Sequence, residues 1–168
     1  PSASPGSLGH HAMAWDAVRQ EVILYGGYTG SAAPGGTWGW NGNTWANKSP
    51  AASPGAVYHH AMVWDSVRQE IVLFGGYRHS STSPINETWV WNGATWTQKS
   101  PAVSPSPRYS HTMAWDAVRQ EVVIHGGYTG SNYLDETWVW NGTTWTQKLP
   151  VHTPGARNET VMFWHPGE

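Results

Sequence analysis

Cysteine is absent from the sequence. The chain therefore has no disulfide bond, no thiolate metal site and no cysteine nucleophile. Because cysteine usage is the usual indicator of a redox compartment, its absence leaves the compartment open. A secreted or cell-surface location is the slightly favoured interpretation.

Charge and long hydrophobic runs are also scarce. Asp, Glu, Lys and Arg together make up 12% of the residues, and the formal net charge is -2. Such a chain has no basic field for nucleic acid or for an anionic membrane surface. No apolar run approaches the roughly 18 residues of a membrane span. We therefore expect neither nucleic acid nor a membrane as a partner. The chain starts at Pro1, which we interpret as the start of a processed or excised segment.

Phenylalanine occurs only twice, against 13 tryptophans, and such a bias needs a repeated cause. The tryptophans fall in four series whose members are 49 or 51 residues apart: Trp15, Trp64, Trp115 and Trp164; Trp38, Trp89 and Trp138; Trp40, Trp91 and Trp140; and Trp45, Trp96 and Trp145. A fixed period of this length is typical of repeat architectures. We expect every tryptophan to be a core residue.

Other residues repeat with the same period. Glycine pairs recur at Gly26-Gly27, Gly75-Gly76 and Gly126-Gly127, and the Asp–Arg pairs are Asp16 and Arg19, Asp65 and Arg68, and Asp116 and Arg119. The pattern divides the chain into repeats at residues 4–52, 53–103 and 104–152, followed by a partial fourth repeat at 153–168. All of them form a single domain.

Each repeat is predicted to contain four short strands. In the first repeat they lie at residues 11–15, 21–25 and 37–40 and from residue 44 onward. Asp16 can accept backbone N–H groups in the turn after the first strand, and Arg19 can pair with it. Asn41-Gly42 predicts a hairpin, because both residues tolerate positive φ. Residues 158–165 are predicted to form an additional first strand.

The sequence resembles kelch repeats of the bacterial type in four features. They are the period near 50, the four strands, the double glycine and the two Trp series at the third and fourth strands. The resemblance covers residues 4–165 and implies an all-β fold built from β-propeller blades of four antiparallel strands. Closed propellers need about four to eight blades. Three repeats plus one strand therefore imply either a fragment of a longer propeller or a homodimer that closes a six-bladed ring.

The resemblance also implies a ligand site at one mouth of the ring. Family members use an Arg just before the first strand and a residue just after the double glycine. The matching positions, with two neighbours in asymmetric loops, are Tyr28, Tyr77, Arg78, Arg108, Tyr128, Tyr133 and Arg157. Leu8 and Val57 stand where the first two blades would carry the Arg, which weakens the case for an anionic ligand.

We expect a non-enzymatic binding or scaffold module, whose ligand is a peptide or, in a lectin-like use, a carbohydrate. The alternative is a structural unit whose only activity is self-assembly. A second alternative is a metal-dependent enzyme that uses a ring of imidazoles from His11, His60 and His111. No nucleophile-elbow motif or phosphate loop is present in the sequence. No cofactor is expected.

Overall fold

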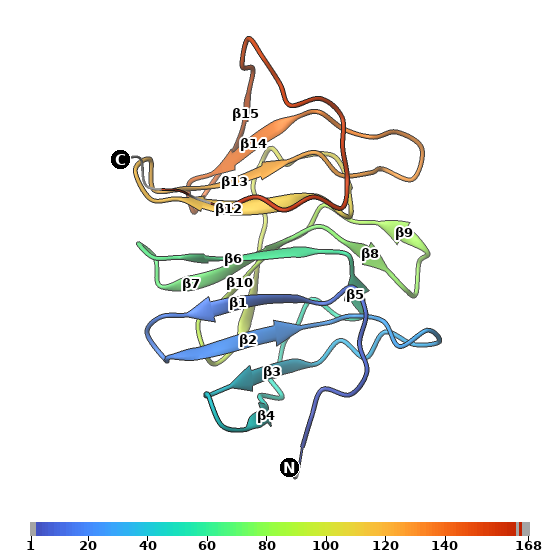
Figure 1. Ribbon diagram of the computed structural model, residues 1–168, viewed down its shortest axis with the longest axis vertical. Helices are drawn as coiled ribbons and strands as arrows, with labels where there is room; N and C mark the ends of the chain where they lie inside the picture. Colours follow the sequence, from blue (N-terminus) through green and yellow to red (C-terminus); the bar gives the residue numbers. More distant parts are fainter. Residues whose placement is uncertain (1–2, 164, 166–168) are drawn as a thin grey trace.

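Three antiparallel sheets of four strands follow one another along the chain in a computed structural model that describes residues 3–163 and 165 (Figure 1). The first sheet contains β1 (Ala12–Asp16), β2 (Glu21–Tyr25), β3 (Thr37–Trp40) and β4 (Trp45–Asn47). The second contains β6 (Ala61–Asp65), β7 (Glu70–Phe74), β10 (Thr88–Trp91) and β11 (Trp96–Lys99). The third contains β12 (Thr112–Asp116), β13 (Glu121–His125), β14 (Thr137–Trp140) and β15 (Trp145–Lys148).

A small fourth sheet lies beside the second one and contains β5 (Val57–Tyr58), β8 (Tyr77–Arg78) and β9 (Ser83–Pro84). No helix occurs among the described residues, and none could therefore span a membrane. Within each large sheet the strands pair in chain order. The predicted second and third strands of the first repeat coincide with β2 and β3, whereas β1 begins one residue later than predicted.

The turn between the first two strands of each sheet is fixed by a buried aspartate. In the second sheet, Asp65 Oδ1 accepts the backbone N–H groups of Val67 and Arg68, both at 3.0 Å. The Arg68 guanidinium donates to Asp65 Oδ2 at 2.6 Å. Asp16 and Asp116 make the same contacts. The predicted role of the aspartate in this turn is confirmed.

The Asn-Gly loop between the third and fourth strands differs from the prediction. Trp40 pairs with Trp45 across it, so the loop has four residues rather than two. Only Gly42 has a positive φ, of +94°. Asn41 instead accepts the N–H groups of Asn43 and Thr44 on its side-chain oxygen. The asparagine therefore acts as a side-chain cap, as Asx turns commonly do.

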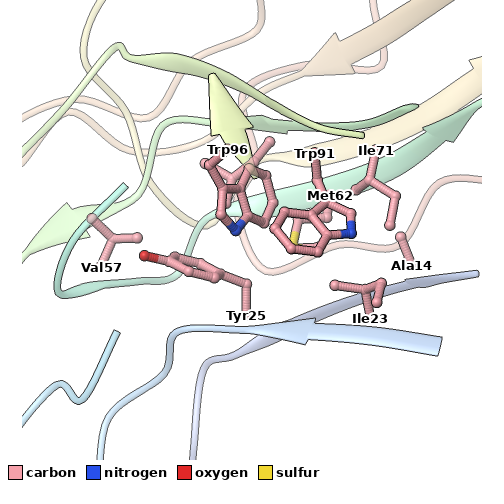
Figure 2. Close-up of a cluster of buried hydrophobic side chains, with 9 residues drawn as sticks. Ala14, Ile23, Tyr25, Val57, Met62, Ile71, Trp91 and Trp96 are labelled. Atoms are coloured by element: carbon pink, nitrogen blue, oxygen red, sulfur yellow. The ribbon is translucent and has the colours of Figure 1, made fainter. Parts of the chain in front are cut away.

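The apolar core lies between the sheets. Figure 2 shows Trp91 and Trp96 of the second sheet packed against Ile23 and Tyr25 of the first. The Tyr25 and Trp96 rings are 5.0 Å apart, and the Trp96 indole N–H donates to Thr37 Oγ1 at 3.0 Å. An equivalent cluster joins the second and third sheets, where the Trp145 indole donates to Thr88. The second sheet thus buries both of its faces, and the first and third sheets each bury one face against it.

The double glycines allow the close approach of successive sheets. A Cβ on Gly75 would lie 2.6 Å from the Arg108 carbonyl oxygen and 3.0 Å from the His111 ring. The Gly76 N–H donates to the same Arg108 carbonyl at 2.9 Å. A side chain here would push the next sheet away. The prediction that these glycines serve sheet packing is therefore correct.

Gly75→Ala should lower the free energy of unfolding because the methyl group meets backbone that cannot move aside. Gly130→Ala is the matched control, since Gly130 also has a positive φ but has no atom within 4 Å of the added Cβ. Overpacking typically costs about 1–3 kcal/mol, so we expect Gly75→Ala to cost about 2 kcal/mol more than the control. Urea titration measures the difference. Equal stabilities would contradict the packing role.

Two predictions of strand and core are wrong. Residues 158–163 and 165 form no strand, although this segment runs along β12 (red in Figure 1). Not every tryptophan is buried either: Trp15 is 50% exposed. Trp15, Trp64 and Trp115 lie on the inner strands β1, β6 and β12 and line a concave surface. Trp64 and Trp115 also pack against the clusters between the sheets. Trp164 lies outside the described residues.

Candidate functional site

Six tyrosines form a continuous row across all three sheets, at the end where the second strands finish. In order along the row they are Tyr28, Tyr58, Tyr77, Tyr109, Tyr128 and Tyr133. Ring centroids of neighbours lie between 4.8 and 5.6 Å apart. We call these six residues the tyrosine row. It contains every tyrosine of the chain except the buried Tyr25.

Short backbone pairings hold the row in place. Tyr58 of β5 pairs with Tyr77 of β8, at the right side of Figure 1. Tyr128 pairs on one side with Tyr109 and on the other with Tyr133. Since one partner precedes the first strand and the other follows the double glycine, the fold brings segments about 20 residues apart into contact. The row therefore lies on segments whose backbones pair with one another and not on isolated loops.

The hydroxyl groups of the row are not equivalent. Tyr28 donates to the Gly30 carbonyl at 2.7 Å, and Tyr77 donates to the Thr82 carbonyl. Among the described residues, the Tyr58 and Tyr109 hydroxyls have no hydrogen-bond partner. Desolvation and the neighbouring tyrosines raise the pKa of both. Both therefore remain protonated donors at neutral pH.

The four predicted mouth tyrosines belong to this row, but the predicted arginines do not. Arg108 is fully buried, and its guanidinium donates to Gly126, to Ser106 and to the Glu136 carboxylate. Every contact that this side chain makes is internal. Its predicted role at a ligand mouth stays a prediction. Burial lowers the pKa of Arg108, and the Glu136 carboxylate opposes this effect.

The other two predicted arginines are also engaged within the chain. Arg78 donates to Glu87 at 2.6 Å and to the Pro54 carbonyl at 3.2 Å. Arg157 is exposed but folds back onto the Gly155 and Pro154 carbonyls. Neither side chain projects into the tyrosine row as a free cation.

A chain of backbone bonds next to the row ties the three sheets together. His59 N–H donates to the His10 carbonyl, Ser110 N–H to the His59 carbonyl, and Glu159 N–H to the Ser110 carbonyl, each at 2.9 Å. All four residues have φ between +53° and +57°. The His10 and His59 rings stack at 3.8 Å. Because non-glycine residues rarely adopt this φ, its recurrence marks a shared structural requirement.

The three histidines of the proposed metal ring do not form one. His60 and His111 are each 6% exposed, and burial lowers their pKa to about 3. His11 donates to or accepts from no other histidine; its Nδ1 lies 3.0 Å from the Leu8 carbonyl oxygen. Within the part of the chain that the structure describes, no group of three His, Asp or Glu side chains could hold a metal ion.

The concave surface on the inner strands encloses a cavity away from these histidines. It is a cavity of about 380 Å³ that contains the four methionines, the inner-strand tryptophans and one phenylalanine. These residues are Met13, Trp15, Met62, Trp64, Met113, Trp115, Met162 and Phe163. It is almost wholly apolar and carries no titratable side chain among its described residues. Catalytic acid–base chemistry therefore has no group here.

Tyr58 and Tyr109 were missed by the sequence analysis. The equivalent position holds Gly9 in the first repeat and Asn158 in the fourth, so the period does not mark it. The only available signal was that both tyrosines directly follow the residue at which an arginine was sought. That signal identifies the position but not its contacts.

Stacked four-stranded antiparallel sheets whose first strands lie on the inside define the blades of a β-propeller. The family model of the KLHDC2/KLHL20/DRC7 Kelch-repeats domain matches residues 9–167, and the chain belongs to the kelch-repeat family. No curated protein matches the chain. Kelch domains typically mediate protein interactions, so the expected class of binding or scaffold module agrees with the family.

Proposed function

We propose that the chain is a non-enzymatic binding module whose ligand-binding surface is the tyrosine row. The observation that carries this proposal is the row itself, since six aromatic rings are gathered on a surface that the fold does not need for its core. Tyrosine supplies a large apolar face with a polar tip, and it is enriched at interfaces. The ligand is a neutral molecule with flat apolar faces, either a peptide or a carbohydrate.

An array of neutral peptides and oligosaccharides tests this proposal. The wild-type protein should bind at least one class. Tyr109→Ala should weaken that binding by at least tenfold, because truncation of a binding hot spot, for which tyrosine is enriched, costs about 2 kcal/mol or more. The melting temperature should be unchanged, since Tyr109 is not part of either apolar cluster. Val103→Ser, at an exposed position away from the row, is the control. The proposal fails if no probe binds, or if binding is indifferent to Tyr109.

A second function, self-assembly, is favoured by the contacts between sheets. Arg19 reaches from the first sheet to the Asn92 carbonyl of the second, and Arg68 reaches from the second to Asn141 of the third. On the outward face of the third sheet, Arg119 occupies the position of these arginines. On the outward face of the first sheet, Asn41 occupies the position of these asparagines. A second copy could supply the missing partner of each face, which supports a head-to-tail homodimer.

Sedimentation velocity tests this assembly. The intact chain should form a dimer at micromolar concentration. Arg119→Lys should weaken the dimer by roughly fivefold, because lysine keeps a charge near Asp116 but loses the second guanidinium nitrogen that would reach the partner. Monomer stability should change little, since the Arg119 side chain is 66% exposed. A wild-type chain that sediments as a monomer would exclude self-assembly.

A further inference from the structure

The charges around the tyrosine row narrow the chemistry of its ligand. Arg78 and Arg108 are paired with the Glu87 and Glu136 carboxylates, and Arg157 is bound to backbone carbonyls. Burial lowers the pKa of His59, and the nearby His10 lowers it further, so its ring is neutral at pH 7. Each of these three arginines therefore already directs its guanidinium to partners within the chain.

The pocket at the centre of the row offers few polar groups to a ligand. It has a volume of about 270 Å³ and is lined by Tyr58, His59, Tyr77 and Tyr109. Tyr77 uses its hydroxyl within its own loop, and His59 Nδ1 lies 3.0 Å from Ser110 Oγ. The two groups left to direct a ligand are the Tyr58 and Tyr109 hydroxyls. None of the four lining residues carries a carboxylate or an amide side chain.

This small set of polar groups, held between aromatic rings, fits one of the two ligand classes better than the other. A carbohydrate presents many hydroxyl groups, each of which donates as well as accepts, so its site needs more polar partners than two tyrosine hydroxyls supply. A proline residue has a carbonyl acceptor but no N–H, and it has a compact apolar ring. A polyproline II helix carries no internal hydrogen bonds, so its carbonyls remain available to donors. Grooves lined by aromatic side chains recognise such helices because the ligand is ordered before it binds.

We propose that the tyrosine row binds a proline-rich peptide in the polyproline II conformation, with the Tyr58 and Tyr109 hydroxyls donating to its carbonyls. This inference rests on the proposed binding function and specifies the ligand of the same site. The tilted rings of Tyr58, Tyr77 and Tyr109, with interplanar angles of 48° and 80°, form the walls between which proline rings pack.

Calorimetric titration of the full chain with an acetylated, amidated oligoproline of about ten residues tests the inference. The matched probes are a blocked Gly-Ser peptide of equal length and maltohexaose. The oligoproline should bind, and the Gly-Ser peptide should bind at least tenfold more weakly. Tyr58→Phe and Tyr109→Phe, which remove only a hydroxyl, should each weaken oligoproline binding by roughly three- to tenfold.

Val103→Ser, at an exposed position outside the tyrosine row, is the control variant. Its affinity should equal that of the wild type, and melting temperatures should agree for all three variants. Binding of maltohexaose without binding of oligoproline would overturn the inference and leave the proposed function standing. Oligoproline binding that is equally strong in the Tyr58 and Tyr109 variants would also overturn it. Failure of every neutral probe would remove both.

Discussion

Acidification from about pH 6 to about pH 5 should lower the free energy of unfolding by about 2–2.5 kcal/mol. His60 and His111 cause this effect, because burial lowers the pKa of each to about 3. Both ring nitrogens of each histidine are buried, and within the described chain they make no hydrogen bond. A proton added to either ring would place an unpaired charge in the core.

The loss of stability on acidification follows from the different histidine pKa values in the unfolded and native states. In the unfolded chain a histidine takes up a proton near pH 6.5, whereas in the native state His60 and His111 remain neutral down to about pH 3. The unfolded state therefore binds more protons as the pH falls below about 6.5. Stability is fully present above that pH and is lost by about 1.4 kcal/mol per pH unit for each histidine.

The surroundings of the two rings reinforce this direction. His60 faces the Tyr25 ring and, at longer range, His11 and His59. His111 faces the Phe74 ring, and the Arg108 guanidinium also lowers its pKa. The backbone groups of Tyr25 and Phe74 favour the charged forms, but burial is the largest effect on both pKa values and outweighs them. The Asp116 and Glu136 carboxylates, whose pKa values are lowered, lose their contributions only at more acidic pH.

Urea titrations at pH 7, 6 and 5 measure the slope. His60→Gln should reduce it by about half, since it removes one of the two titrating groups. His152→Gln is the control, because His152 lies in an exposed segment and should leave the slope unchanged. A wild-type stability that is flat between pH 6 and pH 5 would contradict the prediction. So would a His60→Gln variant with the wild-type slope.

Much of the fold could be predicted from the sequence because each repeat carries the same local signals. The aspartate turn and the double glycine depend on contacts that recur in every repeat, so the period reveals them. The segment at 158–165 shows the limit of this reasoning. It has the sequence of a first strand and runs along β12, but a strand forms only where a neighbouring strand pairs with it, and no described strand pairs with this segment.

The candidate site could be predicted only in part. Tyr28, Tyr77 and Tyr128 repeat with the period and were found, whereas Tyr58 and Tyr109 occupy a position that varies between repeats. Arg108 shows a different limit. Its buried pairing with Glu136 depends on two residues that are 28 positions apart and present together only in the third repeat. The first repeat has Leu8 and Gly36 at these positions, and neither sequence position alone indicates a pair.

Trp91→Ala should cost about 3–5 kcal/mol, the range for removal of a fully buried large aromatic side chain. Trp91 is 0% exposed and packs against the Trp96 ring at 5.5 Å and against residues of the first sheet (Figure 2). Trp15→Ala should cost no more than about 1.5 kcal/mol, since half of that side chain is already in water. The two residues belong to the same repeat pattern, so the comparison separates burial from periodicity.

Chemical denaturation of both variants measures these costs. If Trp91→Ala does not fold, Trp91→Phe replaces it in the comparison. The phenylalanine variant should lose about 1–2 kcal/mol. It leaves a smaller cavity, and it removes an indole N–H that has no hydrogen-bond partner among the described residues, which offsets part of the loss. If Trp15→Ala were as destabilising as Trp91→Ala, the inner strands would have to bury Trp15 against something outside the chain. The concave surface would then be an interface and not a solvent-filled hollow.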